Sequence, residues 1–566
     1  MKISNIYKLF ALIFGTAIVA TGCIQETFPM QGAATKEQVG ESTFAADGMM
    51  SAIPSILVSN IILNDHSDFG YPSLMVNLDH AIGEIIPTVY SAQGNPYYDR
   101  FLRFTYHNNL GPTNGWCAQF WYHYYQFIKL TNDMISVCGD SELLKEQRGV
   151  SKTFRALYYL DMARLYDPLY AVSTERPEYQ ASLAVVEGLT VPLIDENTTE
   201  DAAKNNPRLP REQMFQFIFN DLKDAEYCLK DYAPTSKNQP TLAVVYGLKA
   251  RAYLWLGGFE EGKYDLTQYP DVLTGNAAYK KAAEYARLAI TTSGCKPLTE
   301  AEYCDKKLGF NKANNAWMWC MIQSTDTILA TLYTWAAHMC TEGSWSYGSC
   351  TRLGVRKETY ERMSNTDFRK KLIVGPSAKY EDYKDVTNLT ASEWASWGDE
   401  GLPMSPYAHL KFRTNSGERH NSSTGNVVDI PLMRVEEMYL IEAEATAHYD
   451  ETTGRQLITS FMTTRDPNYK IPVGIAGESF IEEIIFQKRC ELWGEGILFY
   501  DYKRLDMGVN NAYEGHNACP GMDFYSEGRF PIWNLCIPIE EVQQNNALVG
   551  KNNPDPSLTL KPKSQE

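Results

Sequence analysis

The fold of this chain is best indicated by one charged segment, PLMRVEEMYLIEAEA, at residues 431–445. Positions spaced by three and four mark one face of the segment, which is typical of a helix with one buried face: Val435, Met438/Tyr439 and Glu442/Ala443. We therefore predict a strong helix over 432–448. Arg434, Glu437 and Glu444 are candidates for buried or half-buried ion pairs between helices, which would fix packing geometry more than stability.

The same periodicity predicts a largely helical first half. Amphipathic patterns recur between about residues 119 and 291, and another covers 478–496. Small residues lie on the apolar stripes and would allow close pairing of helices: Gly247, Ala250, Ala282 and Ala286. The pattern resembles tetratricopeptide helix pairs, although a strict repeat of about 34 residues is absent. A generic helical domain is the alternative.

Residues 295–430 lose the helical period and are rich in Gly, Ser, Asn and aromatic residues. We expect long loops and a few short strands there, and a loop-rich tail over 509–566. The chain contains 36 Tyr, 23 Phe and 11 Trp. Most of these rings will lie in the core, but Tyr and Trp in loops are what a sugar-stacking surface would need.

The first residues have the order of an export signal. Lys2 and Lys8 precede a short apolar run, which ends in small residues before Cys23. This order predicts a secretory signal peptide over 1–22, too short to span a membrane. A cysteine at the first mature position predicts lipid attachment at Cys23, and an ordinary signal peptide is the alternative. Polar residues 23–45 would then form a tether.

The charge of the chain limits its partners. The formal net charge is −17, and removal of residues 1–22 with their two lysines makes it −19. Such acidity argues against nucleic acid and anionic lipid as partners, and suits a neutral ligand. After Cys23 no apolar run reaches the length of a membrane span, so we expect the mature protein to be anchored and not to span the membrane.

Cysteine and histidine spacings predict no metal site and no cofactor. Eleven cysteines remain after Cys23, and none form a C-x-x-C pair. Cys295/Cys304 and Cys340/Cys350 are close enough in sequence to bridge, and buried free thiols are the alternative. Catalytic signatures such as H-E-x-x-H, G-x-S-x-G and the P-loop are absent, so we do not expect an enzyme.

Several short blocks, taken in order, resemble the SusD/RagB family of outer-membrane nutrient-binding lipoproteins. Two positions depart from the family pattern: Asp167 stands where Gly is usual, and Lys488 where Glu is usual. The matching blocks are residues 35–39, Trp121-x-x-x-Tyr125-x-x-Ile128-x-x-x-Asn132, 155–160 with 166–169, 360–369, 431–445, Arg489-x-Glu491-Leu492-x-x-Glu495-Gly496 with Asp501-x-x-Arg504, and Ile537-Pro538-Ile539 with Glu541 and Asn545.

The resemblance implies a mostly α fold, in which tetratricopeptide-like helix pairs support an irregular, loop-rich ligand-binding half. It implies one domain over 46–566, with helices around 119–291 and 432–496 and a binding region around 295–430. The protein would be anchored in the outer membrane by lipid at the cell surface. There it would capture oligosaccharides for a SusC-like TonB-dependent transporter, without catalysis.

The resemblance also implies where ligand is held: in the loop before the helix that contains Trp121, and in the irregular middle. The candidate ligand-binding residues are Tyr97, Tyr98, Tyr106, Asn108, Asn109, Trp116, Trp335, Trp345, Tyr347, Trp394 and Trp397. For each of them, packing within a loop is the alternative. For the protein, the alternatives are a peptide-capturing member of the same family, a tetratricopeptide-type envelope scaffold lipoprotein, or an enzyme.

Overall fold

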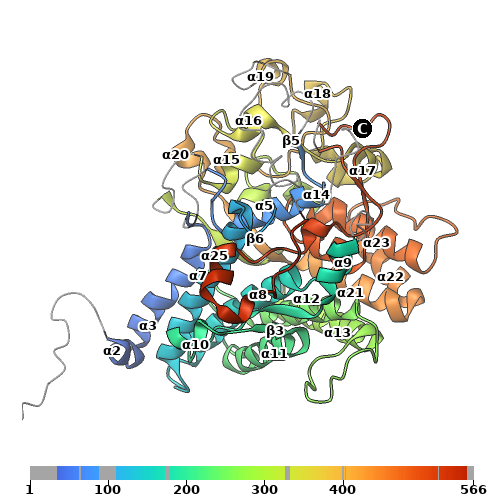
Figure 1. Ribbon diagram of the computed structural model, residues 1–566. Coiled ribbons are helices and arrows are strands. Elements are labelled where there is room, and N and C mark those ends of the chain that lie inside the picture. The colour runs from blue at the N-terminus through green and yellow to red at the C-terminus, as the bar shows by residue number, and fades with distance from the viewer. Residues whose placement is uncertain are drawn as a thin grey trace, which may run out of the picture.

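The structure is a computed structural model in which a helical half supports a second half of short elements (Figure 1). It describes residues 35–60, 62, 66–87, 110–171, 177–325, 332–397, 401, 403–519 and 522–556. The mostly helical fold agrees with the sequence prediction. Within the described ranges, every helix is too short or too polar to cross a lipid bilayer.

Long helices form the lower half in Figure 1; from α7 to α22 each packs against the next in the series, and α23 packs against α21. Small residues bring some of them close together: a Cβ on Gly257 would lie 2.5 Å from the Tyr279 ring of the next helix. The long helices are α7 (Gly115–Cys138), α8 (Lys145–Tyr166), α11 (Arg211–Cys228), α12 (Leu242–Gly257), α13 (Gly275–Ser293), α21 (Val435–Tyr449), α22 (Glu451–Met462) and α23 (Glu478–Leu492).

The second half is built from short elements between α13 and α21, where the sequence predicted loops and strands. Single helical turns are too short to show a period, but their caps stabilise them, as Thr390 does by accepting a hydrogen bond from the Glu393 amide. These elements are α14 (Glu300–Tyr303), η3 (Gly309–Asn311), β4 (Trp317–Ile322), α15 (Trp335–Met339), α16 (Tyr347–Thr351), β5 (Leu353–Gly354), α17 (Lys357–Arg362), η5 (Phe368–Leu372), α18 (Tyr380–Tyr383), α19 (Ala391–Ala395), η6 (Asn415–Gly417) and α20 (Ser422–Gly425).

The remaining elements connect or flank the two halves. Two of them, α2 and α3, begin within the segment that the sequence predicted as a tether, and Lys36 of α2 donates a hydrogen bond of 2.6 Å to Ser136 of α7. They are α2 (Lys36–Gly40), α3 (Thr43–Met50), α4 (Ala52–Ile56), α5 (Tyr71–Ala81), β1 (Ile86–Pro87), α9 (Pro177–Ala184), β2 (Leu189–Pro192), α10 (Glu200–Ala203), β3 (Arg208–Pro210), α24 (Leu498–Arg504), β7 (Val509–Asn510), β8 (Tyr525–Ser526), η7 (Pro531–Trp533), α25 (Ile539–Gln544) and η8 (Asn546–Leu548).

One sequence prediction needs correction at the start of the 432–448 helix. Residues Asp429–Arg434 form strand β6, which pairs antiparallel with β4, and α21 begins only at Val435. The register places Arg434 opposite Trp317 and Asp429 opposite Ile322. Both strands are almost wholly buried, so Leu432 and Met433 bury their side chains as strand residues rather than on a helical stripe.

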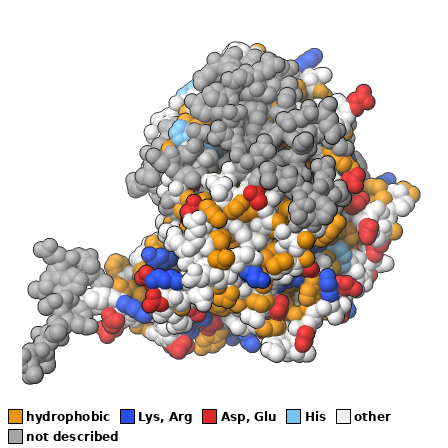
Figure 2. Space-filling model, viewed as in Figure 1, with side chains coloured by type: hydrophobic (Ala, Val, Ile, Leu, Met, Phe, Trp, Pro, Cys, Tyr) orange, Lys and Arg blue, Asp and Glu red, His pale blue; other side chains and the backbone are white. Residues whose placement is uncertain are grey.

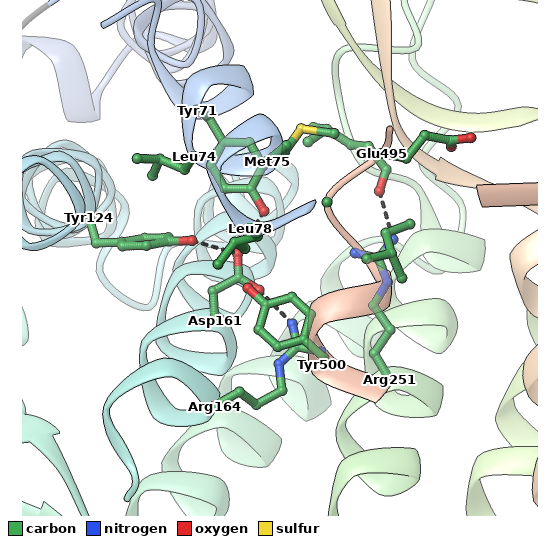
Figure 3. Close-up of a pocket in the computed structure, with 13 residues that line it drawn as sticks. Tyr71, Leu74, Met75, Leu78, Tyr124, Asp161, Arg164, Arg251, Glu495 and Tyr500 are labelled. Carbon is green, nitrogen blue, oxygen red and sulfur yellow. Dashed lines mark hydrogen bonds and ion pairs between the residues drawn. The ribbon is translucent and has the colours of Figure 1, made fainter. Parts of the chain in front are cut away.

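The interior contains a polar pocket between α5, α8, α12 and α24 (Figure 3). The Asp161 carboxylate accepts hydrogen bonds from Tyr71 (2.6 Å) and Tyr124 (3.1 Å), and Arg164 donates to its other oxygen at 2.5 Å. Because Asp161 is only 1% exposed, these three donors supply the compensation that a buried carboxylate needs.

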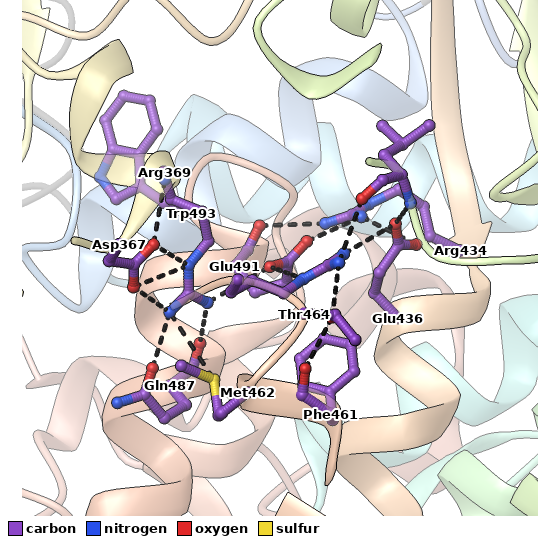
Figure 4. Close-up of polar contacts among 12 residues, drawn as sticks. Asp367, Arg369, Arg434, Glu436, Phe461, Met462, Thr464, Gln487, Glu491 and Trp493 are labelled. Carbon is purple, nitrogen blue, oxygen red and sulfur yellow. Dashed lines mark hydrogen bonds and ion pairs between the residues drawn. The ribbon is translucent and has the colours of Figure 1, made fainter. Parts of the chain in front are cut away.

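A second buried network joins β6, α21 and α23 and confirms the predicted ion pairs. Arg434 lies 3.0 Å from Glu436 and 3.2 Å from Glu491, and Figure 4 shows the three side chains pointing toward one another. Glu437 binds Arg251 of α12 at 2.6 Å. Glu444 binds Lys488 and Arg504, which hold the pKa of its carboxyl well below the ordinary value despite burial.

Ten cysteines whose side chains the structure describes are free thiols, Cys340 among them, and eight of the ten are buried. Cys295 and Cys304 are half-buried and unbridged, as the free-thiol alternative expected. Burial raises the pKa of Cys320 and of Cys340 to about 12. Among these residues, no group of three or more His, Cys, Asp or Glu side chains is arranged to hold a metal ion.

Charged side chains are spread over the outer face of the helical half. Figure 2 shows basic and acidic groups interspersed on this face rather than collected into a single patch. The net charge of −17 therefore acts as a general field over the molecule.

Candidate functional site

Two short helices, α15 and α16, organise the aromatic residues of the second half. Thr334 caps α15 by accepting a hydrogen bond from the Ala337 amide at 3.2 Å, and Ser346 caps α16 in the same way through Ser349 at 3.3 Å. The turn between the helices is tight, because a Cβ on Gly348 would lie 1.9 Å from the Cys340 carbonyl oxygen. The two helices are thereby held in a fixed relation.

Trp345 precedes α16 and is half-buried. Its indole Nε1 donates to the Asn426 side-chain oxygen at 3.0 Å, and the same oxygen accepts from Thr334 at 2.8 Å. A Cβ on Gly425 would lie 2.2 Å from the indole ring, so only glycine leaves room for it. The ring is therefore fixed in orientation while part of its surface stays exposed.

A second group of rings surrounds Tyr347. His66 meets the Tyr333 ring edge-on with centroids 4.8 Å apart, and its Nδ1 hydrogen bonds to the Tyr347 hydroxyl. His338 stacks on Phe69 at 4.3 Å and its Nε2 lies 2.7 Å from the His66 carbonyl oxygen. These contacts attach the segment before α5 to α15 and α16. His66 and Tyr333 are half-buried.

Polar side chains lie next to Trp345 on the loop before α20. The Ser344 amide donates to the Arg419 carbonyl at 2.8 Å, and the Arg419 guanidinium lies 5.7 Å from the Trp397 ring. Arg419 also pairs with Glu393; although burial opposes the shift, hydrogen bonds from Arg419 and Thr390 hold the pKa of Glu393 below its ordinary value. His420 beside them is exposed.

The two groups of partly exposed side chains are linked through Thr334, which follows Tyr333 and shares the Asn426 acceptor with Trp345. We call the two groups together the aromatic surface. It combines ring faces with hydrogen-bonding groups, and that is the composition needed to bind a sugar ring and its hydroxyls. Its members are His66, Tyr333, Trp345, Arg419 and His420.

The predicted ligand-binding residues are distributed unevenly with respect to this surface. Trp345 belongs to it, and Tyr347 and Trp397 lie directly behind it, 4% and 5% exposed. His66 and Tyr333 were missed by the sequence analysis, because their position depends on tertiary contacts. Tyr97, Tyr98, Tyr106, Asn108, Asn109 and the lipid site Cys23 lie outside the described residues.

Three other predicted residues are placed in packing roles. Trp116 is not in a loop but in α7, 2% exposed, and meets Phe120 edge-on at 5.0 Å. Trp335 is 2% exposed in α15 and packs edge-on against Phe412 at 5.1 Å. Trp394 in α19 stacks on Tyr383 at 5.1 Å. In this conformation these rings offer little surface to a ligand.

Two cavities are alternatives to the aromatic surface as the place where a ligand binds. The interior pocket of Figure 3 has a volume of about 20 Å³, which is room for about one water molecule and excludes a sugar. An open cleft of about 590 Å³ lies on the other side of Trp394, lined by Tyr360, Lys370 and Tyr383 among others. Tyr383 is 9% exposed, so this cleft offers less ring surface than the aromatic surface does.

Comparisons with known proteins agree with the architecture. Residues 353–554 match the family model of the SusD family. A SusD-like carbohydrate binding protein from Bacteroides vulgatus ATCC 8482 superposes with a TM-score of 0.66 at 19% identity, covering 89% of this chain and 97% of that chain. A SusD superfamily protein from Bacteroides thetaiotaomicron VPI-5482 gives 0.64 at 16% identity, covering 90% and 99%.

A third solved structure, described as one with xylogluco-oligosaccharide, gives a TM-score of 0.58 at 16% identity, covering 88% of this chain and 97% of that chain. No curated protein matches the sequence. At these identities the structural likeness establishes the fold.

Proposed function

Because residues 353–554 match the SusD family model and the fold is that of SusD-like proteins, we propose that this chain is a cell-surface lipoprotein of the SusD/RagB family, which captures oligosaccharides and delivers them to a SusC-like TonB-dependent transporter. In this proposal the chain binds its ligand without catalysis. Lipid on Cys23 would anchor it in the outer membrane, and the 46–566 domain would face outward. The ligand would be held at the aromatic surface.

The exposed part of Trp345 carries the proposal of glycan binding. A ring that is fixed by Asn426 and Gly425 loses little freedom when a sugar stacks on it, so stacking is favourable at low entropic cost. Arg419 and His420 lie beside it and can donate hydrogen bonds to hydroxyl groups. A solved structure of this fold is described as one with xylogluco-oligosaccharide, which supports a glycan as the ligand class.

The binding is expected to be weak and to favour neutral glycans. The net charge of −17 repels polyanionic chains at long range. A protein that passes its ligand on gains nothing from tight binding, so we expect micromolar to millimolar dissociation constants, about 4–8 kcal/mol. Stacking on two or three rings would supply most of this, at about 1 kcal/mol each.

Isothermal titration of the soluble protein without residues 1–23 tests the proposal. The panel is neutral oligosaccharides, including xylogluco-oligosaccharides, with a set of peptides beside them. Trp345→Ala should weaken binding about fivefold or more, in line with the loss of one stacked ring. Tyr227→Ala on α11 is the control, since its ring is 59% exposed but lies far along the chain in the helical half.

Three outcomes would count against the proposal. If wild type and Trp345→Ala bind glycans equally well, the ligand does not bind at the aromatic surface. Binding of peptides without any glycan would favour the peptide-capturing alternative within the family. Binding of neither, with other envelope proteins co-purifying, would favour a scaffold. Co-purification with a TonB-dependent transporter tests the delivery step.

A further inference from the structure

A small pocket lies in the helical half, where the ends of α8, α12 and α24 approach the start of α11. Its volume is about 160 Å³, below the range of about 300–1,000 Å³ that is usual for drug-sized ligands, so it suits a small group and not an oligosaccharide. The residues that line it are Leu169, Tyr170, Glu187, Arg211, Trp255, Gly258, Phe259, Lys263, Tyr264, Arg504 and Arg529.

The lining of this pocket is basic in a protein that is strongly acidic. It contains four cationic side chains and one carboxylate, that of Glu187. Glu187 lies 4.0 Å from Lys263, and both are about half exposed, so their mutual attraction is weak. The cations are Arg211, Lys263, Arg504 and Arg529.

Arg211 is the most firmly held of these cations. Its guanidinium lies 3.9 Å above the Phe259 ring, and its Nε and Nη2 pair with Asp167. It is also the first residue of α11, where Pro210 provides no side-chain cap. The positive end of an 18-residue helix therefore adds to the charge of the pocket wall.

Another cationic residue, Lys503, lies behind the residues that line the pocket. Lys503 is fully buried, and its Nζ donates to the Leu165 carbonyl at 2.9 Å. Burial, together with Arg529, Arg208 and Arg211, lowers the pKa of Lys503 well below its ordinary value, against the opposing effect of Asp167. Carboxylates nearby balance part of this charge: Asp167 pairs with Arg211, Glu444 and Asp501 pair with Arg504, and Asp506 lies 3.6 Å from Arg529. Lys263 has only the weakly held, half-exposed Glu187 as its partner.

One donor at the pocket has no acceptor. Trp255 lines the pocket, is 2% exposed, and its indole Nε1 makes no hydrogen bond. A buried donor without a partner costs stability that a bound acceptor would recover. An acceptor with negative charge would also suit a lining of four cationic side chains and one carboxylate.

We propose that this pocket binds a small oxyanion, a carboxylate or a sulfate group. The anion would lie against Arg211, Lys263 and Arg529, with the Phe259 and Tyr264 rings closing its apolar sides. The group could belong to a free ion or to an acidic sugar, and the chemistry of recognition is the same. The site is separate from the aromatic surface and does not depend on the proposed glycan binding.

Anion titration of the soluble protein tests this proposal. Sodium sulfate, sodium acetate and sodium glucuronate are each compared with sodium chloride at equal ionic strength, by isothermal titration and by the shift in melting temperature. We expect at least one of the three to bind and to stabilise the protein more than chloride does. If acetate and glucuronate bind with similar affinity, the pocket recognises the carboxylate alone. If glucuronate binds more tightly than acetate, the pocket recognises an acidic sugar.

Four variants test whether the anion binds in this pocket. Lys263→Ala should weaken anion binding about threefold, and Glu187→Gln should strengthen it by a similar factor, since each changes one partly exposed charge. Lys281→Ala is the matched control, because Lys281 also lies over a tyrosine ring and pairs with Glu284, but outside the pocket. Trp345→Ala should leave anion binding unchanged.

The proposal is overturned if sulfate, acetate and glucuronate all act as chloride does. It is also overturned if Lys263→Ala and Lys281→Ala change binding equally, because the effect would then come from general surface charge. Both outcomes are independent of whether glycans bind at Trp345.

Discussion

Arg434 and Glu495 are joined by two hydrogen bonds of 2.9 Å, from Nε to Oε2 and from Nη2 to Oε1. Arg434 ends strand β6, and Glu495 lies in the turn after α23. Lys411 of the second half also reaches Glu495, at 2.6 Å. This carboxylate therefore ties the irregular half to the helical half, and each charge in the group has an opposite partner.

Loss of Arg434 should destabilise the protein without altering the binding surface. Arg434→Ala leaves Glu495 and Glu491 buried with fewer positive partners, which costs about 3–5 kcal/mol. Urea unfolding measures the change. Lys384→Ala, which breaks an exposed pair with Glu381, should cost far less, because exposed ion pairs contribute little to stability. A folded Arg434→Ala protein with strongly reduced glycan affinity would contradict the division between scaffold and site.

Asp79 should make stability depend on pH. Its carboxyl is fully buried and accepts from the Gly496 amide at 3.0 Å, and burial raises its pKa to about 8. Because the folded pKa lies above the unfolded value of about 4, this group stabilises the fold fully below pH 4, and the contribution is lost as pH rises to 8. Asp79→Asn keeps the acceptor but removes the titration.

Urea midpoints of both proteins at pH 5 and pH 8 check this expectation. The stability of Asp79→Asn relative to wild type should increase from pH 5 to pH 8. The difference in the free energy of unfolding between the two proteins is compared at the two pH values, because the contributions of other titrating groups cancel in it. If the two proteins change in parallel, Asp79 is ionised in the folded state and the expectation is wrong.

Gly425 should be required for the orientation of Trp345. A methyl group at this position would overlap the indole ring, so Gly425→Ala should displace the ring and weaken glycan binding by a factor similar to that of Trp345→Ala. Gly48→Ala is the control, because nothing lies within 4 Å of its added Cβ. Affinity is measured by titration and folding by circular dichroism. If Gly425→Ala binds glycans as tightly as wild type does, the orientation of the Trp345 ring does not affect ligand binding and the expectation is wrong.

Cys23→Ala should release the protein from the outer membrane or block its processing, because Cys23 is the proposed site of lipid attachment. Two or three acyl chains anchor a protein firmly, at about 0.8 kcal/mol per buried CH₂ group. Membrane fractionation and metabolic labelling with a fatty acid measure the change. A variant that fractionates and labels like wild type would rule out the lipoprotein hypothesis.

Sequence periodicity predicted the long helices well because each buries a continuous stripe of apolar side chains. It failed at Leu432 and Met433, which are apolar neighbours of a helix but pair as a strand with β4. The three residues from 432 to 434 are too few for periodicity to distinguish a helix from a strand. Here pairing with β4 determines that they form a strand.

The proposed binding surface was only partly accessible to sequence reasoning. Trp345 was proposed because it lies in a stretch without helical period. His66 was not, since it is brought to His338 by a contact between residues 272 positions apart. Trp116 and Trp335 are buried in α7 and α15, because an aromatic residue in a loop-like sequence can still fill the core.

The unbridged cysteines have a consequence for how this protein must mature. Only thiolates undergo disulfide exchange, and burial raises the pKa of thiols such as Cys340 far above the ordinary value of about 8.5. Once the protein is folded, the buried thiols would therefore react slowly even in an oxidising exterior, whereas Cys295 and Cys304 are only half-buried. If the protein is exported as proposed, the vulnerable interval is the unfolded chain just after export, when cysteines scattered along the sequence can cross-link in error. Rapid folding is thus the protection that keeps these thiols reduced.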